Sequence, residues 1–378
     1  MRISMLIGSL CIGCLLAAQA PAQEKKATQP APKAVAEKPA VKAAEQPTET
    51  AAAADKYAVP EAPPKQLVEF IKKLENMPHD DATRKQARAA MLKAAEKILA
   101  GKPNDDEFDF AVEVKTNALD NPDDLAALSE ALKTSGHETQ SRAVLGWSLE
   151  IGLRNAVLSD KPDQVKKRVA AVLDYFKQGP PQPSDLGLAI MTGEIAELQR
   201  DNAYTQQVYR QLAKVFTESK NQNLADFGKR MEGVVRRLSL LGQNMQLEGN
   251  LLSGGTIDFS KYEGRVVLVE FWVSWRQACT AEIAKLRKTY DQYHAEGFEI
   301  VALACDYRRE DAEKFLHENQ MPWATVYGDK GPSPTFEYYG IMTFPTGILI
   351  GKDGKVIALN VTADELDKQL EKLLAPAK

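Results

Sequence analysis

Hydrophobic residues follow two different spacings along the chain. Between residues 65 and 243 they recur every three or four positions, as in the series Leu67, Ile71 and Leu74. This spacing places side chains on one face of a helix. From about residue 244 onward, short and nearly continuous apolar runs alternate with helical stripes. Such alternation is typical of buried strands separated by helices. The two patterns therefore predict an all-α region followed by an α/β region.

The region 65–243 is expected to contain eight or nine helices. Asn121-Pro122-Asp123 and Lys161-Pro162-Asp163 are helix-start signals, and Gly179-Pro180-Pro181 is a stop signal. Short connections favour either a stacked array of helical hairpins or one irregular bundle. No fixed repeat period is found, so no named solenoid family is predicted. The region shows no catalytic motif, and we interpret it as a scaffold or docking surface.

The region 244–378 is expected to form a mixed sheet with helices on both faces. Strands are predicted over 266–272 and 299–304, with helices over 281–293 and 310–319. A hairpin is predicted from strands 346–350 and 356–360, and a closing helix over 362–374. Asp353-Gly354 at the tip of this hairpin favours a type I′ turn. The βαβ-ββα order indicates parallel strands joined to an antiparallel edge.

Two further segments precede the helices. Arg2, the apolar stretch 3–18 and the small residues that follow have the pattern of a cleaved export signal over 1–22. Cys14 is weighed as a lipid anchor, but Cys11 stands where a lipoprotein signal usually has leucine. The segment 23–64 is rich in Ala, Pro, Lys and Glu, so it is predicted to be a disordered linker. The mature protein is accordingly expected in the periplasm or cell envelope.

Composition excludes several classes of function. The net charge of the 378 residues is −4 and no basic cluster stands out, so a nucleic-acid surface is not expected. No apolar run of membrane-spanning length follows the leader. His79 and His137 lie far from other ligand-type residues, whereas a zinc site needs three or four ligands. We predict no metal and no cofactor.

Several motifs in the C-terminal region resemble one known family. The run 266–275, which reads VVLVEFWVSW, resembles the central strand of thioredoxin-like proteins, and most closely the exported TlpA/ResA group of the redoxin (AhpC/TSA) class. Glu282, the entry to the second strand at 297–301 and the terminal hairpin at 351–356 also match. Thr343-Phe344-Pro345-Thr346 resembles the loop in which that family holds a cis-proline beside its active cysteines. The resemblance covers roughly 246–374 and implies a thioredoxin-like fold acting on polypeptides.

The sequence departs from this family at the reactive centre. The family has Trp-Cys-x-x-Cys at the start of a helix, whereas this chain has Trp275-Arg276-Gln277-Ala278-Cys279. The first cysteine is the expected nucleophile, because a helix N-terminus lowers the pKa of a thiol. Arg276 cannot attack a disulfide. Ordinary dithiol exchange through this motif is therefore excluded, and whether the chain is an enzyme is left open.

The remaining thiols and one carboxyl are the candidate chemical groups. Cys279 falls in a helical stripe with Ile283 and Leu286, which indicates a buried packing position. Against this, the resemblance implies that Glu270 accepts a proton from the second cysteine, here Cys279. Cys305 ends the second strand on the same side of the sheet, so it is either a core residue or a redox partner of Cys279. A bridge between them requires Cα atoms within about 7 Å.

Two hypotheses follow for the function. In the first, the domain is redox-attenuated and binds an extended polypeptide of an envelope partner, while the helical region acts as a scaffold. Its binding groove is formed by side chains beside the helix start and the proline loop, namely Trp272, Trp275, Arg276, Phe344, Pro345 and Thr346. In the second, the chain is a single-cysteine thiol–disulfide oxidoreductase with Cys279 as nucleophile and Glu270 as base, with Cys305 as a resolving thiol.

Overall fold

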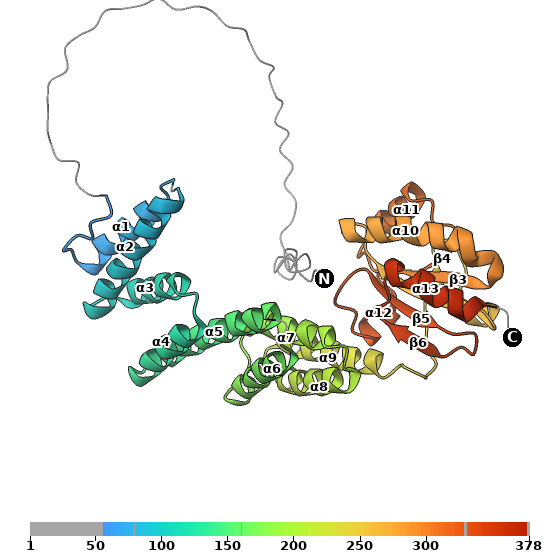
Figure 1. Cartoon of the computed structure of the whole chain (residues 1–378), viewed down its shortest axis with the longest axis horizontal. Coiled ribbons are helices and arrows are strands. Elements are labelled where there is room, and N and C mark those ends of the chain that lie inside the picture. Colours follow the sequence, from blue (N-terminus) through green and yellow to red (C-terminus); the bar gives the residue numbers. More distant parts are fainter. Residues whose placement is uncertain (1–55, 79, 160, 329–330, 376–378) are drawn as a thin grey trace, which may run out of the picture. The chain divides into compact units, whose positions relative to one another are not determined.

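The computed structural model (Figure 1) describes residues 56–78, 80–159, 161–328 and 331–375. The predicted export signal, the Cys14 anchor and most of the predicted linker lie outside these residues. Contacts divide the chain into two units, one ending at Leu119 and the other beginning at Asp120. The division thus falls inside the predicted helical region and not at residue 243.

The described residues of the first unit form a three-helix bundle. Its helices are α1 (Pro64–Glu75), α2 (Asp81–Ala100) and α3 (Asp105–Ala118). Asn104 caps α3 in a reciprocal pair with Glu107, which satisfies two of the free backbone N–H groups at the helix start. The core is apolar, with Val59 and Ala62 packed against it. Because these two residues were assigned to the linker, folded structure begins earlier than the predicted boundary.

The second unit opens with six α-helices and one 3₁₀ turn. The predicted start at Asn121 is confirmed, since its side chain caps the following helix. Edge-to-face aromatic contacts run through the core from Phe176 to Phe216 and on to Phe227, with ring centroids 5.4 and 5.1 Å apart. The elements are α4 (Pro122–Thr134), α5 (Glu138–Leu158), α6 (Pro162–Lys177), η2 (Pro183–Asp185), α7 (Leu186–Leu198), α8 (Asn202–Thr217) and α9 (Gln222–Leu238).

A six-stranded mixed sheet follows in the same unit, in the order β1-β4-β3-β2-β5-β6. β2, β3 and β4 are parallel, whereas β1, β5 and β6 each run antiparallel to a neighbour. The predicted class, α-helices followed by a mixed-sheet α/β domain, is confirmed. The strands are β1 (Asn250–Leu251), β2 (Val266–Trp272), β3 (Phe298–Ala304), β4 (Ala324–Tyr327), β5 (Thr346–Ile350) and β6 (Val356–Leu359).

The helices of the α/β domain begin close to the sequence predictions. Among them, α10 and α13 pack against each other and against the central strands. The helical elements are η3 (Phe259–Tyr262), α10 (Gln277–Tyr293), η4 (His294–Glu296), α11 (Arg309–Glu318), α12 (Pro334–Tyr338) and α13 (Ala363–Leu374). β1, β4 and α12 were not predicted, because elements of two to five residues are too short to show a period.

The turn of the β5–β6 hairpin differs from the prediction. A type I′ turn needs positive φ at both central residues. Gly354 has φ 77°, but Asp353 is not among the residues with positive φ. The Gly351 and Gly354 N–H groups donate to the carbonyls of Lys355 and Gly351, respectively. The loop is therefore a wider turn that closes on Gly351, and the type I′ prediction was wrong.

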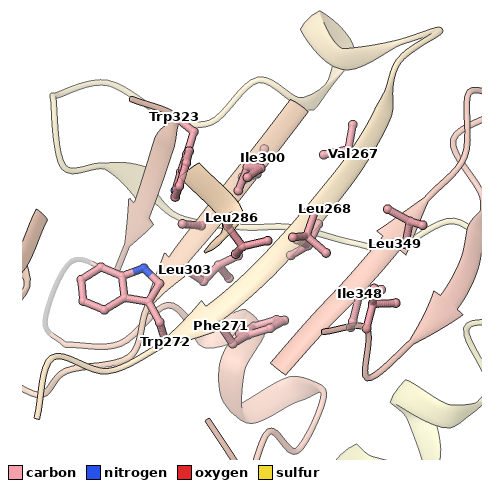
Figure 2. Packing of buried hydrophobic residues seen from close by; sticks show 14 of the residues in the cluster. Val267, Leu268, Phe271, Trp272, Leu286, Ile300, Leu303, Trp323, Ile348 and Leu349 are labelled. Carbon is pink, nitrogen blue, oxygen red and sulfur yellow. The ribbon is translucent and has the colours of Figure 1, made fainter. Parts of the chain in front are cut away.

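The core of the α/β domain is built around β2, whose seven residues are all buried. Trp272 ends this strand and is fully buried, stacking on Phe315 with ring centroids 4.7 Å apart. Figure 2 shows its indole among the packed side chains near Leu303 and Phe271. The continuous apolar run in the sequence thus corresponds to a strand covered on both faces, as expected for a central parallel strand.

Candidate functional site

The candidate site lies where the parallel strands β2 and β3 end. Trp272 is in register with Ala304, and the Cys305 N–H donates to the Trp272 carbonyl at 2.9 Å. Just beyond, the N–H and hydroxyl of Ser274 donate to the Asp306 carboxylate at 3.1 and 2.8 Å. These bonds fix the two loops side by side at the carboxyl edge of the sheet, the edge at which α/β proteins place their ligands.

Arg276 is the N-cap of α10 and makes no side-chain capping bond. Its carbonyl accepts from the Cys279 N–H at 2.9 Å. The first turn of α10 holds no acidic residue, so the positive end of the helix dipole is not compensated within the helix. A guanidinium beside this end adds to the positive potential. The start of α10 is therefore suited to meeting a negative group.

Cys279 is completely buried on the inner face of α10. Burial raises the pKa of its thiol to about 11, and the nearby carboxyls of Glu270 and Asp306 act in the same direction. A backbone hydrogen bond at Val273 and the Arg276 charge oppose the rise but do not cancel it. The geometry favours the packing role that the helical stripe predicted.

Cys305 is also buried, and burial together with Asp306 raises the pKa of its thiol well above the usual range. Both cysteines of the described chain are free thiols. The predicted redox pairing of Cys279 with Cys305 stays a prediction.

Glu270 lies in the middle of β2 and is 2% exposed. Its Oε2 has no hydrogen-bond partner among the described residues. Burial, and secondarily the charge of Glu282, raise the pKa of the Glu270 carboxyl well above its ordinary value. Glu282 in turn accepts a hydrogen bond from the Ala363 N–H at the start of α13. Burial of this kind favours the protonated form of a carboxyl and makes its carboxylate a stronger base.

The proline loop, residues 343–346, has the predicted cis peptide bond between Phe344 and Pro345. Both residues are half-buried, and the Phe344 ring stacks on Phe336 with centroids 5.7 Å apart. Thr346 is 6% exposed and donates its hydroxyl to the Thr343 carbonyl at 2.7 Å. Phe344 and Pro345 are accessible to a partner, whereas the Thr346 side chain is not.

Two of the residues that were predicted to line the binding groove do not line it. Trp272 is inside the core and Thr346 is buried with its hydroxyl occupied, so neither side chain lines an open groove. Trp275, only three positions later, is 60% exposed. The apolar character of an indole does not distinguish these two tryptophans in the sequence. The difference arises because β2 ends at Trp272 and the chain leaves the sheet before Trp275.

Tyr307 was missed by the sequence analysis. It follows β3 as Trp275 follows β2, and it is 82% exposed. The Ser274–Asp306 hydrogen bonds place the residues just before Trp275 and Tyr307 next to each other. The sequence analysis placed the ends of these two parallel strands on the same side of the sheet. Tyr307, which follows the second strand, could have been found from that prediction. No group of three or more potential metal ligands occurs within the part of the chain that the structure covers.

The C-terminal part of the chain is similar to known proteins. The Redoxin family matches residues 241–374. A thiol-disulfide oxidoreductase ResA of Bacillus thuringiensis subsp. konkukian is 31% identical over 123 residues, which are 32% of this chain and 69% of the relative. The chain belongs to the redoxin family. We refer to residues 241–374 as the redoxin domain.

Further relatives align with the same part of the chain. ResA of Halalkalibacterium halodurans is 26% identical over 127 residues, 33% of this chain and 71% of that protein. Among solved structures, the thioredoxin domain of a thiol-disulfide oxidoreductase from Bacteroides vulgatus has 30% identity and a TM-score of 0.33, covering 35% of this chain and 97% of that one. A putative DsbE from Chlorobium tepidum has 29% identity and a TM-score of 0.32, covering 36% and 99%.

The helices of both units can be compared with the length and apolar character of a membrane span. None of the helices in the described ranges combines the length and the apolar character that crossing a bilayer requires.

Replacing the buried carboxyl of the redoxin domain by Glu270→Gln is expected to stabilise the fold in a pH-dependent way. Because the pKa of Glu270 is raised in the folded chain, no free energy is lost to ionisation below the ordinary value of 4.5, and stability falls as pH rises above that value. The glutamine amide has the same shape and does not ionise, so the fall in stability with rising pH is expected to disappear. The gain in the free energy of unfolding is therefore expected to be larger at pH 8 than at pH 4.

Urea unfolding of both chains at pH 4 and pH 8 measures this effect. Glu318→Gln, which removes an exposed carboxyl from α11, is the matched control and is expected to leave the difference between the two pH values unchanged. An equal gain from Glu270→Gln at both pH values would show that the carboxyl is not desolvated in the folded chain.

Proposed function

We propose that this chain is an exported redoxin-family protein that binds an extended polypeptide of an envelope partner and does not carry out dithiol exchange. The observation that carries the proposal is the pairing of Arg276 at the start of α10 with a fully buried Cys279. The leader over 1–22, outside the described residues, supports export. The helical elements of the second unit serve as the scaffold of the binding surface.

The chemistry of thiol exchange supports the part of the proposal that denies dithiol exchange. Exchange begins with attack by a thiolate that is exposed to its substrate. The Arg276 side chain is not a nucleophile. The Cys279 thiol has a pKa of about 11, so only about one part in 10⁴ is ionised at pH 7. Cys279 is in addition shielded from a disulfide by its complete burial. Neither position supplies the first step.

The accessible groups support the binding part. Trp275 offers an exposed indole, and Phe344 and Pro345 offer half-buried apolar faces on the proline loop. Arg276 offers a planar cation at the positive end of α10. Aromatic and arginine side chains are the types most often found at the energetic centres of interfaces. This combination is suited to a polypeptide that presents a carboxylate next to apolar side chains.

The second candidate function is a single-cysteine thiol–disulfide oxidoreductase. The observation in its favour is Glu270, a buried carboxyl whose Oε2 has no hydrogen-bond partner among the described residues and which lies close enough to Cys279 to raise the pKa of its thiol. In that case Glu270 takes the proton of Cys279, and Cys305 resolves the mixed disulfide. The ResA relatives are named as thiol-disulfide oxidoreductases. This candidate requires that Cys279 become accessible.

Binding is tested with reduced, S-carboxymethylated α-lactalbumin, an unfolded acidic polypeptide without free thiols. The emission of Trp275 is isolated by subtracting the titration of Trp275→Phe, because Trp147 is also partly exposed and the probe has tryptophans of its own; the difference is expected to show a blue shift. Arg276→Gln is expected to weaken binding about tenfold, as the loss of one charge-assisted hydrogen bond. Lys288→Gln removes the same charge about 18 Å further along α10 and is the control. No emission change at any concentration would overturn the proposal.

The two candidate functions are separated by alkylation of Cys279 and Cys305, measured residue by residue by mass spectrometry between pH 6 and pH 10. The redox-silent proposal expects no labelling until urea unfolds the chain, because both thiols are buried. Rapid labelling of Cys279 with a midpoint well below the free value of about 8.5 would instead support the oxidoreductase. Labelling only after reduction would show a Cys279–Cys305 bridge.

A further inference from the structure

Two loops at the carboxyl edge of the sheet are joined through one carboxylate. Ser274, between β2 and α10, donates its N–H to both oxygens of the Asp306 carboxylate at 3.1 Å and its hydroxyl to Oδ1 at 2.8 Å. Asp306 lies between β3 and α11 and is 3% exposed, so water has little access to these bonds. The Tyr327 hydroxyl of β4 donates to the Asp306 carbonyl at 3.0 Å and fixes that loop to the sheet. We call Ser274 and Asp306 the latch.

Each residue of the latch is followed by an aromatic residue. Trp275 comes directly after the first latch residue and Tyr307 directly after the second, and both side chains are largely exposed. The pairing of β2 with β3 ends at Trp272, whose carbonyl accepts from the Cys305 N–H. The latch continues the connection between the two chain segments beyond that point. It therefore determines where the backbones that carry the two rings stand relative to each other.

The latch carboxylate costs the fold free energy. Burial raises the pKa of Asp306 above its ordinary value, and the hydrogen bonds from Ser274 only partly oppose that rise. A neutral or apolar pair of similar size would join the two loops without this desolvation cost. The carboxylate adds three acceptor contacts, which fix the backbone and the side chain of Ser274 together. The arrangement is thus suited to setting a geometry and not only to packing.

Loops that are held in place favour binding. A partner that contacts mobile loops must order them, and the free energy of that ordering is lost from the affinity. Aromatic side chains are common at the energetic centres of interfaces. Trp275 and Tyr307 are therefore the groups whose contribution to binding gains most when their loops are fixed beforehand.

We propose that Asp306 is the positioning residue of the polypeptide-binding surface, and that this surface includes Tyr307 as well as Trp275. Asp306 acts through Ser274 and does not itself contact the partner, because it is buried. The extended polypeptide lies across both rings at the carboxyl edge of the sheet. This inference rests on the proposed function and names the residues that present its surface to the partner.

The Ser274 hydroxyl allows the latch to be weakened without changing either ring. Ser274→Ala removes its hydrogen bond to Asp306 and is expected to weaken binding of carboxymethylated α-lactalbumin about fivefold. Ser274→Thr keeps the hydroxyl and is expected to bind within about twofold of the native chain. Ser260→Ala breaks a pair of the same kind with Asp258, ahead of the opposite end of β2, and is the matched control. Native-like binding by Ser274→Ala would overturn the role of the latch.

The contribution of Tyr307 is measured by Tyr307→Ala, which is expected to weaken the same binding about tenfold. Leu158→Ala removes another exposed apolar side chain, at the end of α5, and is expected to leave the affinity unchanged. In a chain that also carries Ser274→Ala, the loss caused by Tyr307→Ala is expected to be smaller, because the ring is no longer held beside Trp275. An unchanged affinity of Tyr307→Ala would exclude Tyr307 from the surface.

Trp275 gives a readout of the latch that needs no partner. The anisotropy of its fluorescence, isolated by subtracting the matching chain with Trp275→Phe, reports how firmly its loop is held. Because burial raises the pKa of Asp306 above the ordinary 3.8, the anisotropy is expected to fall with decreasing pH before an exposed aspartate titrates, and to stay level in Asp306→Asn. The same fall in both chains would contradict the latch. Both chains keep the other titratable groups around this residue, namely Asp311 of α11, the thiols of Cys279 and Cys305, and Tyr327 of β4.

The binding outcomes separate this inference from the proposed function. If the native chain does not bind carboxymethylated α-lactalbumin, the proposed function and the inference both fail. If the native chain binds it and Ser274→Ala and Tyr307→Ala bind it equally well, the inference alone fails.

Discussion

Arg276→Cys is expected to give the chain the disulfide-reductase activity that the proposed function denies to the native sequence. The substitution places a thiol at the N-cap of α10, where the helix dipole and free N–H groups favour the thiolate. That thiolate attacks a substrate disulfide and forms a mixed disulfide. Cys279, three residues later, then attacks and releases the reduced substrate, and dithiothreitol reduces the new disulfide. Supplying the missing nucleophile is expected to raise the rate by roughly two orders of magnitude or more.

Insulin reduction by dithiothreitol, followed by turbidity, measures this gain. Arg276→Ser removes the same charge without adding a thiol and is expected to stay at the level of the native chain. Combining Arg276→Cys with Cys279→Ala is expected to stop turnover after the mixed disulfide. If Arg276→Cys reduces neither insulin nor a small disulfide, the surroundings of the site have diverged from the redoxin pattern along with the motif.

Gly340→Ala is expected to destabilise the second unit by roughly 2–5 kcal/mol. Gly340 has φ 57°, which costs a side-chain-bearing residue about 1–2 kcal/mol. Its Cβ would also overlap the backbone of α9, at 2.2 Å from the Arg230 carbonyl oxygen and 2.4 Å from the Val234 nitrogen. Relieving such an overlap requires helix and loop to separate, which adds about 1–3 kcal/mol.

Urea unfolding monitored by circular dichroism gives the free energy of unfolding for this comparison. Gly264→Ala is the matched control, because Gly264 has φ 76° but an added Cβ there meets nothing within 4 Å. Gly264→Ala is expected to lower the free energy of unfolding only by the cost of placing alanine at positive φ. An equal fall in the free energy of unfolding for the two substitutions would mean that α9 is not in close contact with the segment before the proline loop.

Much of the redoxin domain was predictable because its signals are local. The apolar runs of β2 and β3 and the stripe of α10 are set by which side chains meet the core, so a period in the sequence reveals them. The cis bond at Pro345 followed from a resemblance between short motifs. β4 was missed because its four residues acquire their role only by pairing with β3.

The candidate site was predictable only in part. Arg276 and the burial of Cys279 followed from the motif and the helical stripe. Trp272 was wrongly placed in the groove, because the end of β2 and not the residue type determines which tryptophan reaches solvent. The place of Tyr307 depends on strand register, and the packing of α7 near the end of β6 depends on contacts between residues far apart in the chain, such as Glu197 with Asn360.

The sequence by itself determined that a redoxin-type domain follows a helical region and that its first reactive position holds an arginine. Both are properties of neighbouring residues, whose order and spacing are fixed along the chain. Only the tertiary structure decided which side chains line the site, how far burial raises the pKa of Cys279, and that α7 is hydrogen-bonded to the residue after β6. Exposure, desolvation and helix–sheet contacts depend on atoms brought together by folding, and these do not appear in any local pattern.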